Sequence, residues 1–192
     1  MRGQLSWKRC EEIKILIVEM FEECEVHRYP LDPFYIAERL CYIVRPYSEL
    51  CLADRLDALD ISDDGYSQVE QIPGLGFRYV IYYNDLTLSE GRIRWTLFHE
   101  IGHCYLGHHD NPDDELSSIE EQEANFFAKI AIAPPVLIYK LNCDCPSAVA
   151  HRFETSLQAA DYIFVSYQKW LTCSPYYTEY EMRLLRMFGL AA

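Results

Sequence analysis

Basic residues are scarce in this chain. Its 192 residues include 17 lysines and arginines against 30 aspartates and glutamates, which gives a formal net charge of −13. A nucleic-acid-binding surface needs clustered Lys and Arg to contact phosphates. The composition therefore argues against direct nucleic-acid binding and favours protein or cationic partners.

Long apolar runs and paired cysteines are also missing. Charged residues interrupt the apolar stretches 13–21 and 126–139, so neither predicts a membrane span. The eight cysteines are scattered without C-x-x-C spacing, and the sequence shows no secretory signal. We therefore expect reduced thiols and a cytoplasmic protein. Half of the residues are hydrophobic, which suffices for one well-buried folding unit, so we expect a single domain over residues 1–192.

The apolar pattern predicts an α+β protein with many helices and a small sheet. Ser89 is a suitable N-cap for a helix over 90–106, and Gly107 provides a stop. We expect strands at 41–47 and 77–84, and a third, on a weaker pattern, at 65–72. The other expected helices cover residues 11–25, 33–40, 117–132, 134–141, 147–153, 156–171 and 178–189.

The expected helix over 90–106 contains His99-Glu100-Ile101-Gly102-His103, a His-Glu-x-x-His motif. Residues four apart share one face of a helix, so His99 and His103 can bind one metal ion from successive turns. Glu100 would lie beside the open position of that metal, where it can act as a general base. Two histidines at this spacing can also be ordinary hydrogen-bonded core residues, but the helical context favours a zinc site.

A catalytic zinc ion takes three protein ligands, so a third must come from elsewhere. The acidic segment that begins the expected helix 117–132 offers Glu120, Glu121 and Glu123. At 100° per residue, Ala124 and Ala128 fall within about 60° of Glu121, whereas Glu123 is about 200° and Glu120 about 100° away. Small alanines allow this face to approach the motif helix closely. Glu121 is therefore the predicted third ligand.

Three other residues stay as alternatives for the third ligand. Glu123 is the first of them, unless it belongs to a solvated helix face. His109 stands where the longer motif His-Glu-x-x-His-x-x-Gly-x-x-His has its last histidine, but the glycine is displaced from position 106 to Gly107. His108 is a weaker candidate.

The segments Arg94 to His103 and Glu121 to Ala128, followed by Pro134, resemble the ImmA/IrrE family of small cytoplasmic zinc metallopeptidases. The resemblance spans about residues 30 to 170. Where the family commonly has an aliphatic residue, Met and Pro, this chain has Ile132-Ala133-Pro134.

The resemblance implies a minimal zincin-like fold, in which a small antiparallel or mixed sheet packs on the motif helix. It also implies that His99, His103 and Glu121 are the zinc ligands and that Glu100 is the catalytic residue.

On this basis the single domain is divided into three parts. Residues 1–40 are a helical lead-in, residues 41–133 are the zincin-like core, and residues 134–192 are a helical C-terminal layer.

Members of the family are typically encoded near helix-turn-helix repressors of mobile elements and inactivate them, in several cases by cleavage. The resemblance thus implies a zinc-dependent endopeptidase, a metalloprotease that takes part in transcription regulation by cutting such a repressor in the cytoplasm. The alternative is a non-catalytic or weakly catalytic binding module that sequesters the repressor.

Three further patterns concern possible ligands. A peptide substrate could pair with an exposed sheet edge, for which Tyr79 to Tyr83 is the best candidate, the alternative being that this segment is an interior strand. Residues 60–65 mimic the start of a calcium loop, but Gln71 stands where a bidentate Glu is required, so we expect a turn. Residues 147–170 are similar to a helix-turn-helix, yet the second helix has almost no basic residue besides Lys169. We expect this segment to be a packing layer.

Overall fold

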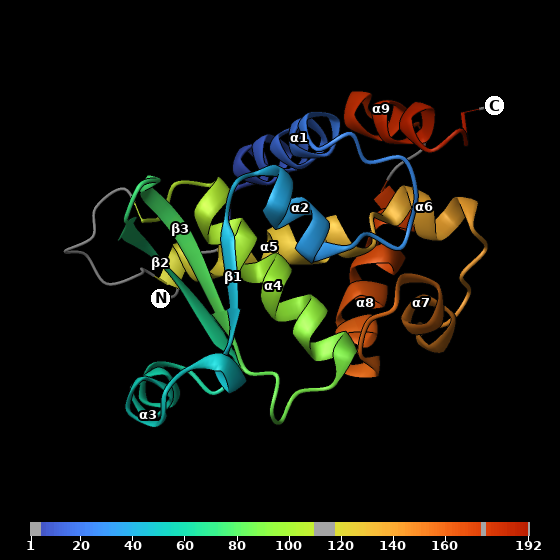
Figure 1. Ribbon diagram of the computed structural model, residues 1–192. Helices are drawn as coiled ribbons and strands as arrows, with labels where there is room; N and C mark the ends of the chain where they lie inside the picture. The colour runs from blue at the N-terminus through green and yellow to red at the C-terminus, as the bar shows by residue number, and fades with distance from the viewer. Residues whose placement is uncertain (1–4, 110–117, 174–175, 192) are drawn as a thin grey trace.

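The structure is a computed structural model that describes residues 5–109, 118–173 and 176–191. It has an α+β, zincin-like architecture, with a small sheet at one side of the molecule and helices above and beside it (Figure 1). In chain order the elements are α1 (Trp7–Glu23), α2 (Pro33–Arg39), β1 (Ile43–Pro46), the 3-10 helix η1 (Tyr47–Glu49), α3 (Leu52–Ile61), β2 (Gly65–Ile72), β3 (Gly76–Tyr83), α4 (Glu90–Tyr105), α5 (Ser118–Ile132), α6 (Pro135–Lys140), α7 (Pro146–Phe153), α8 (Leu157–Cys173) and α9 (Glu179–Met187).

The helices and strands expected from the sequence are present, with boundaries shifted by a few residues. Ser89 is the N-cap of α4, as predicted, and its side chain accepts a hydrogen bond from the backbone N–H of Arg92. The expected start of α5 at residue 117 lies outside the described residues. The structure adds α3, which the sequence pattern did not indicate because a single residue of that helix, Ala58, is buried. The turn expected at 60–65 is shorter than predicted, since α3 continues to Ile61 and β2 begins at Gly65.

The sheet has the strand order β1-β3-β2. β1 is parallel to β3, with Ile43 opposite Val80, and β2 is antiparallel to β3, with Gly65 opposite Tyr83. The prediction that Tyr79 to Tyr83 forms an exposed edge was therefore wrong, because this segment belongs to the central strand. Its consecutive buried residues, Val80 and Ile81, are typical of an interior strand. Within the described sheet, β2 is the edge strand that lies against α4.

Helices α4 and α5 pack closely against each other at the centre of the main hydrophobic core. Gly102 of α4 faces Phe127 of α5, and a Cβ atom added at Gly102 would lie 3.1 Å from the side chain of Phe127. The ring of Phe127 is fully buried. The absence of a side chain at Gly102 thus lets the two helices approach closely, which brings the start of α5 beside the motif in α4.

The C-terminal helices form a packing layer, as predicted for the segment similar to a helix-turn-helix. The turn between α7 and α8 lies against the first turn of α4, where a Cβ atom at Gly91 would lie 2.5 Å from the backbone nitrogen of Ser156. Arg94 of α4 also donates hydrogen bonds to the carbonyl and carboxylate of Glu154 in this turn. Contacts with α4 therefore hold the turn between α7 and α8 in place, whereas Leu157 in the first turn of α8 is 62% exposed. Across the described ranges, no helix has the length and apolarity to cross a bilayer.

Candidate metal centre

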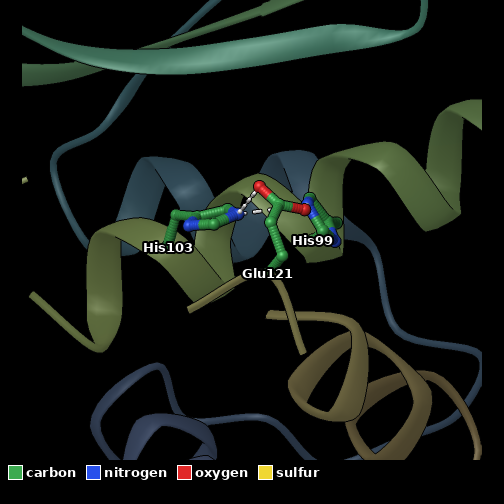
Figure 2. Close-up of side chains that lie close together, drawn as sticks. All are labelled: His99, His103 and Glu121. Carbon is green, nitrogen blue, oxygen red and sulfur yellow. Dashed lines mark hydrogen bonds and ion pairs between the residues drawn. The ribbon is translucent and has the colours of Figure 1, made fainter. Parts of the chain in front are cut away.

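Two helices provide the residues that the sequence analysis selected as metal ligands. His99 and His103 lie on successive turns of α4, and Glu121 lies in the first turn of α5. Figure 2 shows the Glu121 carboxylate between the two imidazole rings. The predicted set of three residues is thus brought together by the close packing of α4 and α5.

The distances among the three side chains fit a metal site. Nε2 of His99 and Nε2 of His103 are 3.1 Å apart. The Glu121 carboxylate lies 3.5 Å from Nε2 of His99 through Oε2 and 3.4 Å from Nε2 of His103 through Oε1. In a tetrahedral zinc site with bonds of about 2.0–2.2 Å, the ligand atoms are about 3.3–3.6 Å apart. Two imidazoles and one carboxylate are also a donor set that suits a catalytic zinc ion.

The charge distribution agrees with a site for a cation. The side chain of His103 is 1% exposed, that of His99 is 16% exposed, and that of Glu121 is 47% exposed. Contacts with the imidazoles of His103 and then of His99 hold the pKa of Glu121 well below its usual range. Burial lowers the pKa of His99, but its hydrogen bond with Glu121 and the charges of Glu100 and Glu121 outweigh burial, so the net shift is upward.

Glu100 is buried between α4 and the sheet, where it touches β2. Its Oε2 atom accepts a hydrogen bond of 2.7 Å from the hydroxyl of Ser67. Burial raises the pKa of Glu100, and the positive field of the two histidines and the Ser67 hydrogen bond offset part of that effect. The carboxylate is thus held in one orientation next to the candidate metal site. The sequence does not point to Ser67, because this serine belongs to no recognisable motif.

The three alternative ligands lie elsewhere. Nε2 of His109 is 2.8 Å from the Ser67 hydroxyl, on the side of the sheet. His108 and Glu123 contact each other, with 3.1 Å between Nε2 of His108 and Oε2 of Glu123. None of the three belongs to the group of side chains that could hold a metal ion in the described residues. The phase argument that separated Glu121 from Glu123 therefore agrees with their positions in the structure.

Glu123 is instead bound to Arg9 of α1. Both oxygens of its carboxylate accept hydrogen bonds from Arg9, at 2.8 Å from Nε and 2.7 Å from Nη2. Burial raises the pKa of Glu123, but the hydrogen bonds from Arg9 and His108 outweigh burial and the net shift is downward. No sequence pattern indicates this contact, since 114 residues separate the two partners.

The site opens into a cavity of about 430 Å³. The cavity is bounded by β2, by α4 and by the start of α5. Besides the residues already described, it is lined by Tyr66, Arg92 and Trp95. The candidate ligands and Glu100 are thus accessible from one side of the molecule, next to an edge strand.

A family of peptidases matches this part of the chain. The model of the IrrE N-terminal-like domain covers residues 55–164, more than half of the sequence, and includes both helices of the candidate metal centre. The chain belongs to this family. The resemblance to the ImmA/IrrE family found in the sequence is thereby confirmed.

Membership in the IrrE N-terminal-like family supports a metallopeptidase-type function and implies that the substrate is a protein. The candidate site in α4 and α5 lies within the matched range. A search of the curated proteins finds no match to the chain. The site residues of this chain therefore have to be argued from their own geometry.

Proposed function

We propose that the chain is a zinc-dependent endopeptidase that cleaves a cytoplasmic protein, with His99, His103 and Glu121 as zinc ligands and Glu100 as the catalytic base. The observation that carries the proposal is the convergence of two imidazole nitrogens and one carboxylate at 3.1–3.5 Å from one another. These three donors leave a fourth position of a tetrahedral ion for water or substrate, which distinguishes a catalytic site from a structural one. Family membership supports the same class of reaction.

A zinc ion bound by these ligands supplies a Lewis acid that polarises the scissile carbonyl and activates water at neutral pH. The protein contributes the proton transfers. Glu100 takes a proton from the attacking water and delivers it to the nitrogen of the leaving amine, so that the peptide bond breaks as the new C–O bond is retained. Burial raises the pKa of Glu100, which brings a carboxylate closer to the working pH and makes it a better proton acceptor. The Ser67 hydrogen bond orients the carboxylate for both transfers.

We expect the substrate to bind along the edge strand β2. Its residues Tyr66 and Ser67 line the cavity, and its outer backbone edge is not paired within the described sheet. An extended segment of a partner protein could add to this edge by backbone hydrogen bonds, which would place a peptide bond next to Glu100. From the family resemblance we propose that this partner is a helix-turn-helix repressor of a mobile element.

The proposal is tested with the repressor encoded nearest to the gene of this chain. Purified repressor is incubated with zinc-loaded wild type, Glu100→Gln and the control Glu90→Gln, and the products are identified by mass spectrometry. Glu90 is an exposed acid on the same helix, so its substitution matches the charge change without touching the site. We expect wild type and Glu90→Gln to cut the repressor at one position, and Glu100→Gln to keep zinc and bind the repressor without cutting it.

Two results would overturn this function. Equal cleavage by Glu100→Gln and wild type would exclude Glu100 as the base. Tight binding of the repressor by all three proteins without any cleavage would show that the chain is the sequestering module that the sequence left as the alternative.

A further inference from the structure

The second ring nitrogen of His103 is part of a chain of hydrogen bonds that leads away from the candidate metal site. Nδ1 of His103 lies 2.9 Å from Nδ1 of His108. Nε2 of His108 lies 3.1 Å from Oε2 of Glu123, and both oxygens of Glu123 are held by Arg9. These hydrogen bonds therefore connect α1, α5 and the end of α4.

The end of α4 explains why His108 can reach His103. Gly107 has a positive φ of 76°, which turns the backbone immediately after the helix. The backbone N–H of His108 donates to the carbonyl of His103 at 3.0 Å, and that of Gly107 donates to the carbonyl of Cys104 at 3.2 Å. This Schellman arrangement folds His108 back onto the last turn of α4. The displaced glycine that weakened the case for His109 as a ligand is thus the residue that positions His108.

Three members of this hydrogen-bond chain are enclosed by protein, and Arg9 is its partly exposed end. The side chains of His103, His108 and Glu123 are 1%, 5% and 9% exposed. Two N–H groups cannot face each other at 2.9 Å, so one of the two Nδ1 atoms donates and the other accepts.

The Glu123 carboxylate determines which atom donates in each hydrogen bond of this series. A carboxylate held by an arginine only accepts, so Nε2 of His108 carries a proton and donates to Glu123. The guanidinium of Arg9 already balances the charge of Glu123, and a further cation on the buried side chain of His108 would be unfavourable, so His108 is neutral and its Nδ1 accepts. Nδ1 of His103 then donates, which leaves a lone pair on Nε2, the atom that faces His99 and Glu121.

We propose that Arg9, Glu123 and His108 are positioning residues that fix the tautomer and ring orientation of His103 for metal binding. The inference rests on the proposed metal centre, to which it adds three residues that do not touch the ion. His99 lacks an equivalent chain at its Nδ1 atom, which is buried without a hydrogen-bond partner among the described residues. His103 is therefore the ligand whose geometry is set before the metal arrives.

The first test reads zinc affinity by competition with a chromophoric chelator. Loss of hydrogen-bonded support for a metal-ligating histidine typically weakens metal affinity 10- to 100-fold. We expect about a 10-fold loss for His108→Leu and for Arg9→Met, and recovery in His108→Gln, whose amide can accept from His103 and donate to Glu123.

Arg183→Met is the matched control for Arg9→Met. Arg183 also forms a two-pronged pair with a glutamate, Glu22, and this pair also ties α1 to another helix. Its loss should leave zinc affinity within 2-fold of wild type. Equal zinc affinity of Arg9→Met, His108→Leu and wild type would overturn the proposal, as would equal losses in Arg9→Met and Arg183→Met.

The second test needs no metal. In zinc-free protein labelled with 15N in its histidines, NMR correlations between ring nitrogens and ring protons should show His103 with its proton on Nδ1. His108→Leu should abolish this preference and His108→Gln should restore it. A proton on Nε2 of His103 in wild type would contradict the proposed direction. This measurement uses zinc-free protein, so it tests the role of His108 independently of zinc binding. If wild type bound no zinc, that result would refute the proposed function but not the role of His108.

Discussion

The packing of α4 on α5 can be tested at Gly102. Replacement by alanine removes the conformational cost of glycine in a helix, which alone would stabilise the protein by about 1 kcal/mol. The new Cβ atom, however, would lie 3.1 Å from Cβ, Cγ and Cδ1 of Phe127, closer than the 3.4–4 Å of ordinary contact. Because Phe127 is fully buried in the core, the strain cannot be released into solvent. Overpacking of this kind costs about 1–3 kcal/mol.

We therefore expect Gly102→Ala to lower the free energy of unfolding by about 1 kcal/mol, the difference between these two effects. The same substitution should weaken zinc binding, because α5 has to move away from α4 and carries Glu121 with it. Urea unfolding of the zinc-free protein measures the first effect, and chelator competition measures the second.

A double-mutant cycle with Phe127→Ala isolates the contact. This substitution removes Cγ and Cδ1, two of the three atoms that the new methyl group would meet, so the combination should be more stable than the sum of the single effects by about 1 kcal/mol. Stabilisation of the protein by Gly102→Ala, with unchanged zinc affinity and no coupling to Phe127→Ala, would refute the reasoning.

Three further predictions follow from buried polar groups. Burial lowers the pKa of Lys129 to about 8 from a usual value of 10.5. The unfolded chain therefore binds the extra proton between about pH 8 and 10.5, and this group should make stability rise across that window by at most about 3 kcal/mol. Denaturant titrations at pH 8 and 10 should show a smaller rise in Lys129→Met than in wild type. Glu181→Ala should lower the free energy of unfolding by about 3 kcal/mol, because it removes the acceptor for Trp170 Nε1 at 2.5 Å and for the N-cap backbone of Thr178 at 2.7 Å; an unchanged urea midpoint would contradict this. Ser67→Ala should reduce turnover about 10-fold at unchanged zinc content, since it removes the donor that orients the catalytic carboxylate.

The sequence was sufficient to predict the helical part of the site. His99 and His103 are four residues apart on a helix whose N-cap is recognisable, so helix geometry alone places their rings on one face. Glu121 could be chosen over Glu123 because their helical phases differ by about 200° and a close helix pair needs small residues at its contact. Both the shared face of the two histidines and the choice of Glu121 follow from the helical period of the local sequence.

The contacts that support the site could not be predicted, because they join segments that are distant in sequence. Arg9 reaches Glu123 from α1, and Ser67 reaches Glu100 from the edge strand. The wrong edge assignment has a related cause. The pattern of Tyr79 to Tyr83 predicts a strand, but only the pairing of β3 with both β1 and β2 shows that it is central. Pairing partners are a tertiary property that a single sequence does not specify.

The most direct test of the metal centre is the zinc content of the purified protein after saturation with zinc and removal of the excess. Wild type and Glu100→Gln should each hold about one zinc ion per chain by elemental analysis, because the described residues bring together one candidate set of ligands, which does not include Glu100. His103→Ala and Glu121→Ala should hold almost none while remaining folded by circular dichroism. Zinc content at the wild-type level in both of these variants, or wild type without zinc, would contradict the proposed metal centre.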